Sequence, residues 1–316
     1  KGRTWTKYEN NPVLANPGIK DFRDPKVKWH EESESWIMSL AVKDKISFYT
    51  SANLLEWTYL SDFNPDWAAY GGVWECPDLF PLKTESGEEK WVLLVSINPG
   101  GPNGGSATQY FVGDFDGSKF TTETKEVKWI DYGADNYAGV TWSNVPKEDG
   151  RKLFLGWMSN WLYANEVPTE VWRSAMTVPR SLELMKNGDD YSIASRPIVE
   201  LKKLRASTEE QNGDLISLKS DVLELEMKSQ GGDFKMTFSN NQGDKLVIDK
   251  TDDLVHFDRS QAGLKDFSDL FAAVHKVPLK GVQVKDIGAT LAVKSNTVST
   301  FKKQILNKTG ATNSIN

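Results

Sequence analysis

Two short acidic motifs stand at matching places in two strand-rich repeats of this 316-residue chain. They are Arg23-Asp24-Pro25 and Glu75-Cys76-Pro77-Asp78, and each leads into a run of strand-forming residues. A repeated unit of about 40–50 residues with four strands is typical of β-propeller blades, whose innermost strands line one central channel. We therefore expect the two motifs to converge at that channel, although they lie far apart in the chain. Paired carboxyl groups in such a place are what hydrolysis of a glycosidic bond requires.

Glu75 is the candidate proton donor of this pair. Pro77 removes a backbone donor and keeps the chain extended, which suits the mouth of a strand rather than its middle. Trp74, the neighbour of Glu75, would supply an aromatic wall against which a sugar ring can pack. A carboxyl group in that setting can protonate a glycosidic oxygen. The alternative, from the tetrapeptide alone, is an ordinary glutamate in a turn.

Asp24 is the second candidate carboxylate. We expect the Arg23 guanidinium to lie beside it and to favour its charged form. A charged carboxylate there could accept hydrogen bonds from vicinal sugar hydroxyls. The alternative is a salt bridge that closes a turn, and the motif taken alone favours it.

Two later segments combine polar and aromatic residues that could line a sugar site. The first, DYGADNYAGVTWSN, contains Asp135, and the second, GWMSNWLYANEVPT, contains Trp157 and Trp161. Asp and Asn at a strand entrance can bind hydroxyl groups or can form an Asx-type turn. Strand alternation predicts core packing for Trp157 and a place in the cleft for Trp161. Cys76 has no adjacent histidine, so we expect a small buried residue rather than a nucleophile.

Composition excludes several other functions. The net charge is −6 and no long basic block occurs, which argues against a nucleic-acid partner. The longest apolar runs are too short for a helix that crosses a membrane. One cysteine rules out an internal disulfide, and the three histidines lack the spacing of metal ligands. The 12 tryptophans suit propeller packing or sugar stacking, and none follows Trp172.

The texture of the sequence divides the chain into two parts. Short strands separated by Gly, Pro, Asn and Asp clusters predict an incomplete β-propeller over residues 1–197. A linker is expected over 198–207, where ELKKLRAS could be a short helix or an extended connector. Strict apolar–polar alternation then predicts a β-sandwich over 208–316, and that domain is also possibly incomplete. We expect the first blade at 22–62, the second at 76–130 and the third to extend to about 197.

The motifs together resemble the β-fructosidase family of glycoside hydrolases, which includes levanases, inulinases and invertases. The matching segments keep the family order and cover most of residues 1–197. The resemblance implies a five-bladed propeller followed by a β-sandwich. It also implies retaining hydrolysis of β-fructosides without a metal or cofactor. The segments are FRDPKV, WECPDLF, VSINPGGPNGGSATQYFVGDFDG, DYGADNYAGVTWSN and GWMSNWLYANEVPT.

Roles for individual residues follow from the resemblance. Glu75 would be the acid/base, and Asp24 would stabilise the transition state through fructose hydroxyls, with Arg23 helping to position it. Asp135 and Trp161 would line the fructose or the leaving-group side.

One departure from the family pattern bears on catalysis. The family nucleophile is an Asp in an Asn-Asp-Pro-x-Gly segment, and none of the 316 residues forms such a segment. Asn64-Pro65-Asp66 is the nearest string, but its order and place differ. We expect the portion that carries the nucleophile to be missing from this chain, or to be supplied by another segment or chain. The covalent glycosyl-enzyme cannot form without it, so the isolated chain is expected to be inactive or nearly so.

Three functions therefore compete. The first is a β-fructofuranosidase that acts on levan, inulin or sucrose. The second is a relative that binds fructosides without cleaving them. The third is another five-bladed glycosidase of the arabinanase type, against which the NPGGPNGGSATQYFVGDFDG segment argues. We expect a secreted rather than a cytoplasmic protein, with neither nucleic acid nor membrane as a partner.

Overall fold

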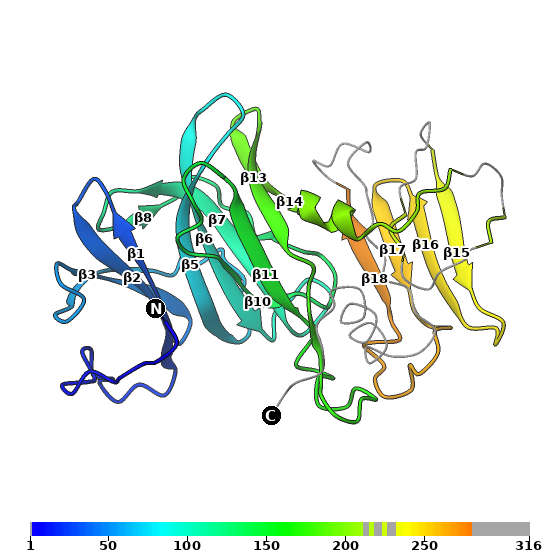
Figure 1. The fold of residues 1–316 in the computed structure, drawn as a ribbon, viewed down its shortest axis with the longest axis horizontal. Coiled ribbons are helices and arrows are strands. Elements are labelled where there is room, and N and C mark those ends of the chain that lie inside the picture. The colour runs from blue at the N-terminus through cyan, green and yellow to red at the C-terminus, as the bar shows by residue number, and fades with distance from the viewer. Residues whose placement is uncertain (1, 211–214, 218–222, 226–231, 280–316) are drawn as a thin grey trace.

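The computed structural model describes residues 2–210, 215–217, 223–225 and 232–279, and strands dominate this part of the chain (Figure 1). The strands form four antiparallel sheets that follow one another along the sequence. Within each sheet the strands lie mainly in chain order, because short turns join each strand to the next. The helical structure in these residues is a single 3-10 helix, η1 (Val199–Leu204), which leads from the third sheet to the fourth.

The strands are as follows. The first sheet contains β1 (Phe22–His30), β2 (Ser35–Val42), β3 (Lys45–Ser51) and β4 (Thr58–Phe63). The second contains β5 (Val73–Lys83), β6 (Glu89–Asn98), β7 (Ala107–Phe115), β8 (Phe120–Thr121) and β9 (Lys128–Trp129). The third contains β10 (Tyr137–Thr141), β11 (Lys152–Met158), β12 (Ala175–Met176), β13 (Arg180–Asn187) and β14 (Asp190–Pro197). The fourth contains β15 (Phe234–Ser239), β16 (Lys245–Thr251), β17 (Leu254–Asp258) and β18 (Val274–Pro278).

Two aromatic and aliphatic clusters hold the first three sheets together. Phe48, Trp74 and Leu93 belong to the cluster that joins the first sheet to the second. Phe80 and Phe154 belong to the cluster that joins the second sheet to the third. The second sheet is therefore buried on both faces, which explains the continuous apolar run WVLLVSI in its central strand.

A β-bulge occurs near the start of the first strand of each of these three sheets. The pairing register shifts between Arg23 and Lys26 in β1, between Glu75 and Asp78 in β5, and between Tyr137 and Val140 in β10. In each case one extra residue is inserted. The second residue of each bulge has a positive φ, and these residues are Asp24 (57°), Cys76 (49°) and Ala138 (50°).

The bulges show which residues of the two acidic motifs are structurally equivalent. Their first residues, Arg23, Glu75 and Tyr137, are structural equivalents. Asp24 corresponds to Cys76, and Asp78 corresponds to Lys26, so Asp24 and Asp78 are not equivalent.

Polar contacts also tie the three bulged strands to one another, and β5 contacts both β1 and β10. Asp78 is buried and accepts hydrogen bonds from the Thr141 backbone N–H (2.6 Å) and hydroxyl (2.8 Å). The Lys26 ammonium group lies 3.4 Å from the Asp78 carboxylate and donates to the Thr141 carbonyl at 2.6 Å. Asp78 therefore has a structural role, since it fixes the spacing of the strands that carry the motifs.

The fourth sheet lies beyond the 3-10 helix (Figure 1). It has its own small core of Phe238, Ile248 and Val255. The parts of the β-sandwich predicted over 211–214, 218–222, 226–231 and 280–316 lie outside the described residues.

Gly139, in the bulge of β10, packs so closely on Phe154 that a substitution there tests the packing of this bulge. A Cβ atom at this position would lie 2.1 Å from the Phe154 ring, which is fully buried. We expect Gly139→Ala to lower the free energy of unfolding by about 1–3 kcal/mol, because overpacking forces the ring or the bulge to move. Urea unfolding measures the change. Adding Phe154→Leu should return part of the loss, and an unchanged midpoint in Gly139→Ala alone would contradict this packing.

Candidate active site

Glu75 lies at the meeting point of the three bulged strands. One oxygen of its carboxylate, Oε1, accepts hydrogen bonds from Arg23 Nη2 (2.7 Å) and Nε (3.3 Å). The other oxygen, Oε2, accepts a hydrogen bond from the Tyr137 hydroxyl. The Glu75 side chain is 22% exposed, so it remains open to solvent on one side. The three structurally equivalent residues therefore form one hydrogen-bonded line, with the carboxylate in the middle.

Tyr137 is a site residue that the sequence analysis did not single out. Its side chain is buried, and burial, followed by the hydrogen bond to Glu75, raises the pKa of its hydroxyl well above the usual range. The group therefore stays protonated and can donate to Glu75. Aligning the third repeat on the first two would have found it, because Tyr137 occupies the place of Arg23 and Glu75.

Asp24 contacts the second motif in a different way than expected. Its Oδ2 accepts a hydrogen bond from the Cys76 backbone N–H at 3.0 Å. The expected pairing of Arg23 with Asp24 is not what the structure has, since the guanidinium binds Glu75 and Asp21 instead. The reason is the positive φ of Asp24, which turns the two neighbouring side chains in different directions.

The bulge also brings the Cys76 thiol near the same carboxylate. Cys76 Sγ lies 3.7 Å from Asp24 Oδ2. Burial and, after it, the nearby charges of Asp24 and Glu75 raise the pKa of the thiol to about 12. Cys76 is thus a neutral donor beside Asp24, which agrees with the expectation that it is not a nucleophile.

Trp74 lies in the core and not in the expected aromatic wall. Its side chain is completely buried, stacks on Tyr70 with a centroid distance of 5.3 Å, and donates its indole N–H to the Ala69 carbonyl. Strand alternation explains this, since neighbours in β5 point to opposite faces and Glu75 points to the site. A buried ring cannot touch a sugar, so Trp74 supports β5 from behind.

Trp161 and Asp135 lie on loops next to this site. The Trp161 side chain is 51% exposed, and its ring lies 5.1 Å from that of Trp157, which in turn lies 6.2 Å from the Tyr137 ring. Trp161 therefore connects to Glu75 through a row of aromatic rings. Asp135 accepts hydrogen bonds from the Tyr163 hydroxyl and from Arg259 Nη1, so its carboxylate is already occupied by protein groups.

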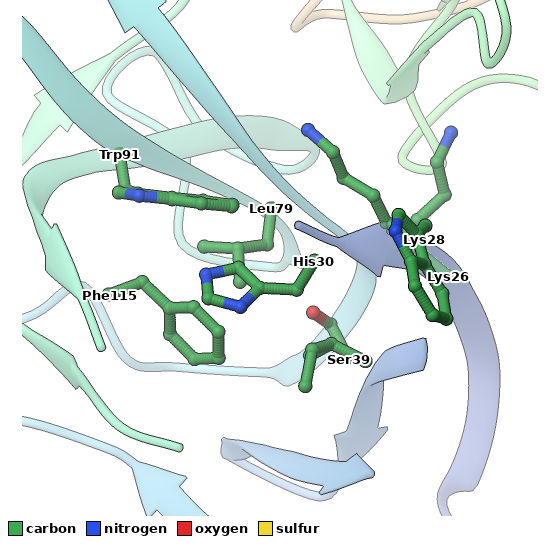
Figure 2. A pocket seen from close by; sticks show the side chains of 9 residues that line it. Lys26, Lys28, His30, Ser39, Leu79, Trp91 and Phe115 are labelled. Atoms are coloured by element: carbon green, nitrogen blue, oxygen red, sulfur yellow. The ribbon is translucent and has the colours of Figure 1, made fainter. Parts of the chain in front are cut away.

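A small cavity lies between the first and second sheets (Figure 2). The His30 ring packs there against Phe115 and Trp91, with centroid distances of 5.5 and 5.4 Å. Lys28 places its ammonium group 5.2 Å from the centre of the Trp91 ring, and burial lowers its pKa to about 8. The cavity is a packing feature of the sheet interface, because its walls are mostly aromatic and aliphatic side chains.

In the part of the chain that the structure describes, no His, Cys, Asp and Glu side chains gather in a group that could hold a metal ion. No helix in those residues is long and apolar enough to cross a membrane.

Sheets of antiparallel strands that join a half-buried carboxyl group to a guanidinium and a phenol are consistent with the glycosidase class. The chain belongs to glycosyl hydrolase family 32, since the model of that family's N-terminal domain matches residues 1–197. It is 43% identical over 306 residues to the levanase of Bacillus subtilis, a match that spans 90% of this chain and 45% of the levanase.

Solved structures agree with this assignment. The exo-inulinase from Aspergillus awamori matches with a TM-score of 0.72 and 31% identity, over 85% of this chain and 58% of that one. The β-fructofuranosidase from Schwanniomyces occidentalis complexed with fructosyl-erythritol matches with a TM-score of 0.71 and 32% identity, over 87% and 59%. The chain spans less than two thirds of the length of each of these relatives.

The single cysteine allows the neutral state of Cys76 to be tested directly. With a pKa of about 12, only about one thiol in 10⁴ is ionised at pH 8, so we expect iodoacetamide to react at least 100-fold more slowly than with a free thiol. Mass spectrometry follows the reaction, and the urea-unfolded chain provides the control because its thiol should react at the normal rate. Equal rates in the folded and unfolded chains would contradict a half-buried thiol that stays neutral.

Proposed function

We propose that this chain provides the acid/base half of a retaining glycosidase that cleaves β-D-fructofuranosidic bonds in levan, inulin or sucrose. The observation that carries the proposal is the Glu75 carboxylate held between Arg23 and Tyr137. The names of the relatives supply the substrate class, since they are a levanase, exo-inulinases and a β-fructofuranosidase.

Glu75 has the surroundings that an acid/base group needs in both of its states. As a carboxylate it accepts hydrogen bonds from Arg23 and from the Tyr137 hydroxyl. When Glu75 carries the proton, the Tyr137 hydroxyl can rotate and accept instead, because a phenol is both donor and acceptor. Glu75 would give its proton to the leaving-group oxygen and later take one from water.

Asp24 is proposed to bind fructose hydroxyls as charge develops on the sugar. Its Oδ2 is fixed by the Cys76 backbone N–H, while among the described residues its Oδ1 has no hydrogen-bond donor. One oxygen therefore orients the carboxylate and the other can accept from substrate. Arg23 acts on Glu75 rather than on Asp24, and Trp161 is proposed as an aromatic surface on the leaving-group side.

The proposed architecture is the part of a five-bladed propeller that holds three of its blades, over 1–197, followed after the linker at 198–207 by a β-sandwich domain from 208 onward. Three successive antiparallel sheets of four, five and five strands support the first part, because the bulged first strands of the outer two both contact that of the middle one, β5. The single sheet β15–β18 beyond η1 supports the second.

Secretion is also proposed, since relatives of this chain are named extracellular exo-inulinases.

The 316 residues contain no Asn-Asp-Pro-x-Gly segment, so we expect this chain alone to release no fructose above the blank from sucrose, inulin or levan. Chromatography of the products measures the release, and Glu75→Gln serves as the matched control. Release that disappears in Glu75→Gln would support Glu75 as the acid/base. It would also mean that another carboxylate of the chain replaces the expected nucleophile.

In a polypeptide extended by the segment that carries the nucleophile, Glu75→Gln should lower kcat by about 10²–10⁴-fold and leave the fold intact, because it removes the proton and keeps the shape. Hydrolysis of levan together with circular dichroism measures both effects. Turnover near that of the unsubstituted protein would contradict the role of Glu75.

Asp24→Asn should weaken fructose binding about tenfold in this chain, because an amide is a poorer acceptor for sugar hydroxyls than a carboxylate. Calorimetric titration with fructose or a short levan oligosaccharide measures the affinity. Asp114→Asn, an exposed change in an ion pair on the second sheet, is the control. Equal affinities for the two variants would exclude Asp24 from the sugar site.

A further inference from the structure

An ion pair between Arg259 and Asp135 joins the segment after β17 in the fourth sheet to a loop of the candidate active site. Arg259 follows β17, and its Nη1 lies 3.0 Å from Asp135 Oδ2. Asp135 lies on the loop that enters β10. The two side chains are 20% and 25% exposed, so the pair is largely shielded from water.

Phe271, between β17 and β18, and His275, in β18, lie against the Arg259 guanidinium on two further sides. The central carbon of the guanidinium lies 4.0 Å from the centre of the Phe271 ring, and Nη2 lies 3.5 Å from Nε2 of His275. His275 Nε2 lies 3.0 Å from the Leu270 carbonyl oxygen and donates to it in the neutral ring, so the histidine is a close neighbour of the guanidinium and not its acceptor. Burial lowers the pKa of His275, so this ring is neutral at pH 7 and does not repel the guanidinium. These neighbours restrict the positions that the Arg259 guanidinium can take beside Asp135.

Asp135 is linked to two residues of the candidate site, Tyr137 and Trp161. Two residues after it comes Tyr137, which begins the third bulge and donates to Glu75. The Tyr163 hydroxyl also donates to Asp135, and two residues before Tyr163 comes Trp161. One carboxylate therefore joins the loop of the tyrosine, the loop of the tryptophan and the fourth sheet.

Docking of the fourth sheet does not itself need this charged pair. Asn103 exchanges two hydrogen bonds of 3.1 Å with the backbone of Lys276 in β18. Phe267 and Phe271 pack against Tyr163 with centroid distances of 6.1 and 5.8 Å. A shielded ion pair is rarely more stabilising than apolar packing, whereas its directional bonds fix geometry well.

We propose that Arg259 is a positioning residue for the active site, which orients Tyr137 against Glu75 and the Trp161 loop through Asp135. The sugar-binding part of this inference rests on the proposed function, while the positioning of Tyr137 does not. In this way the fourth sheet takes part in shaping a site that the first three sheets build.

The test compares Arg259→Met with Arg205→Met. Arg205 also forms an ion pair, with Glu224 at 2.6 Å, but it does not touch the site loops. The chain is labelled with ¹³C in its tyrosine rings, and Tyr→Phe variants assign the signals of Tyr137 and Tyr163. We expect Arg259→Met to move the Tyr137 signal and Arg205→Met to leave it in place.

Fructose binding provides the functional readout. Arg259→Met should weaken the affinity by roughly 2–30-fold, the range expected when a coupling residue outside the site is removed. Arg259→Lys should restore part of it, because it keeps the charge near Asp135 but loses the fixed geometry of the guanidinium. Circular dichroism confirms that each variant is folded. If Arg259→Met does not fold, Asp135→Asn replaces it, since the amide oxygen still accepts from Tyr163.

An unchanged Tyr137 signal in a folded Arg259→Met chain would overturn the proposal and leave Arg259 with a docking role only. An affinity equal to that of Arg205→Met would overturn the link to sugar binding. If the unsubstituted chain binds no fructoside, the proposed function fails for this chain, and the Tyr137 signal still decides whether Arg259 positions the tyrosine.

Discussion

The candidate active site depends on one backbone feature, the extra residue inserted near the start of β1, β5 and β10. In a regular strand, successive side chains point to opposite faces, so consecutive residues cannot serve one site. A bulge interrupts that alternation and re-aims side chains. Because all three bulges lie at the same register, the first residue of each one reaches the same point, where Arg23 and Tyr137 enclose Glu75.

The second residue of each bulge, Asp24, Cys76 or Ala138, has a positive φ, which most residues other than Gly adopt only at a cost. Asp tolerates this conformation better than most residues other than Gly, whereas Cys and Ala adopt it at a cost. The cost is offset by the contacts made at that point, since Asp24 Oδ2 accepts a hydrogen bond from the backbone N–H of Cys76, its counterpart in β5 of the second sheet. The strained residues of neighbouring strands thus support one another. Pro25 and Pro77 follow them, whereas the third bulge has Gly139, because the Phe154 ring leaves no room for a side chain.

The sequence predicted the all-β fold and the convergence of the two acidic motifs, because strand periodicity and repeat length are local properties. It misjudged Trp74, because strand alternation places this ring on the face opposite Glu75. It also misjudged the partner of Arg23, because that depends on which way the side chains turn at a bulge. Trp74 precedes the inserted residue and points into the core, where it is completely buried. A bulge has no periodicity signal of its own, so its effect on neighbouring side chains could be found only from the structure.

Tyr137 and Arg259 were missed for a different reason. Tyr137 lies in a segment that was singled out for Asp135 and not for its tyrosines, and Arg259 lies in no segment that was singled out. Each acts through a partner that is distant in the sequence. The Arg259–Asp135 pair joins positions 124 residues apart. Loops between strands lack the backbone pairing that fixes a sheet, so the loops at Asp135 and Trp161 need side-chain partners to hold a defined shape. A guanidinium that is itself fixed by Phe271 is suited to that purpose, because little conformational freedom remains to be lost when it binds the carboxylate.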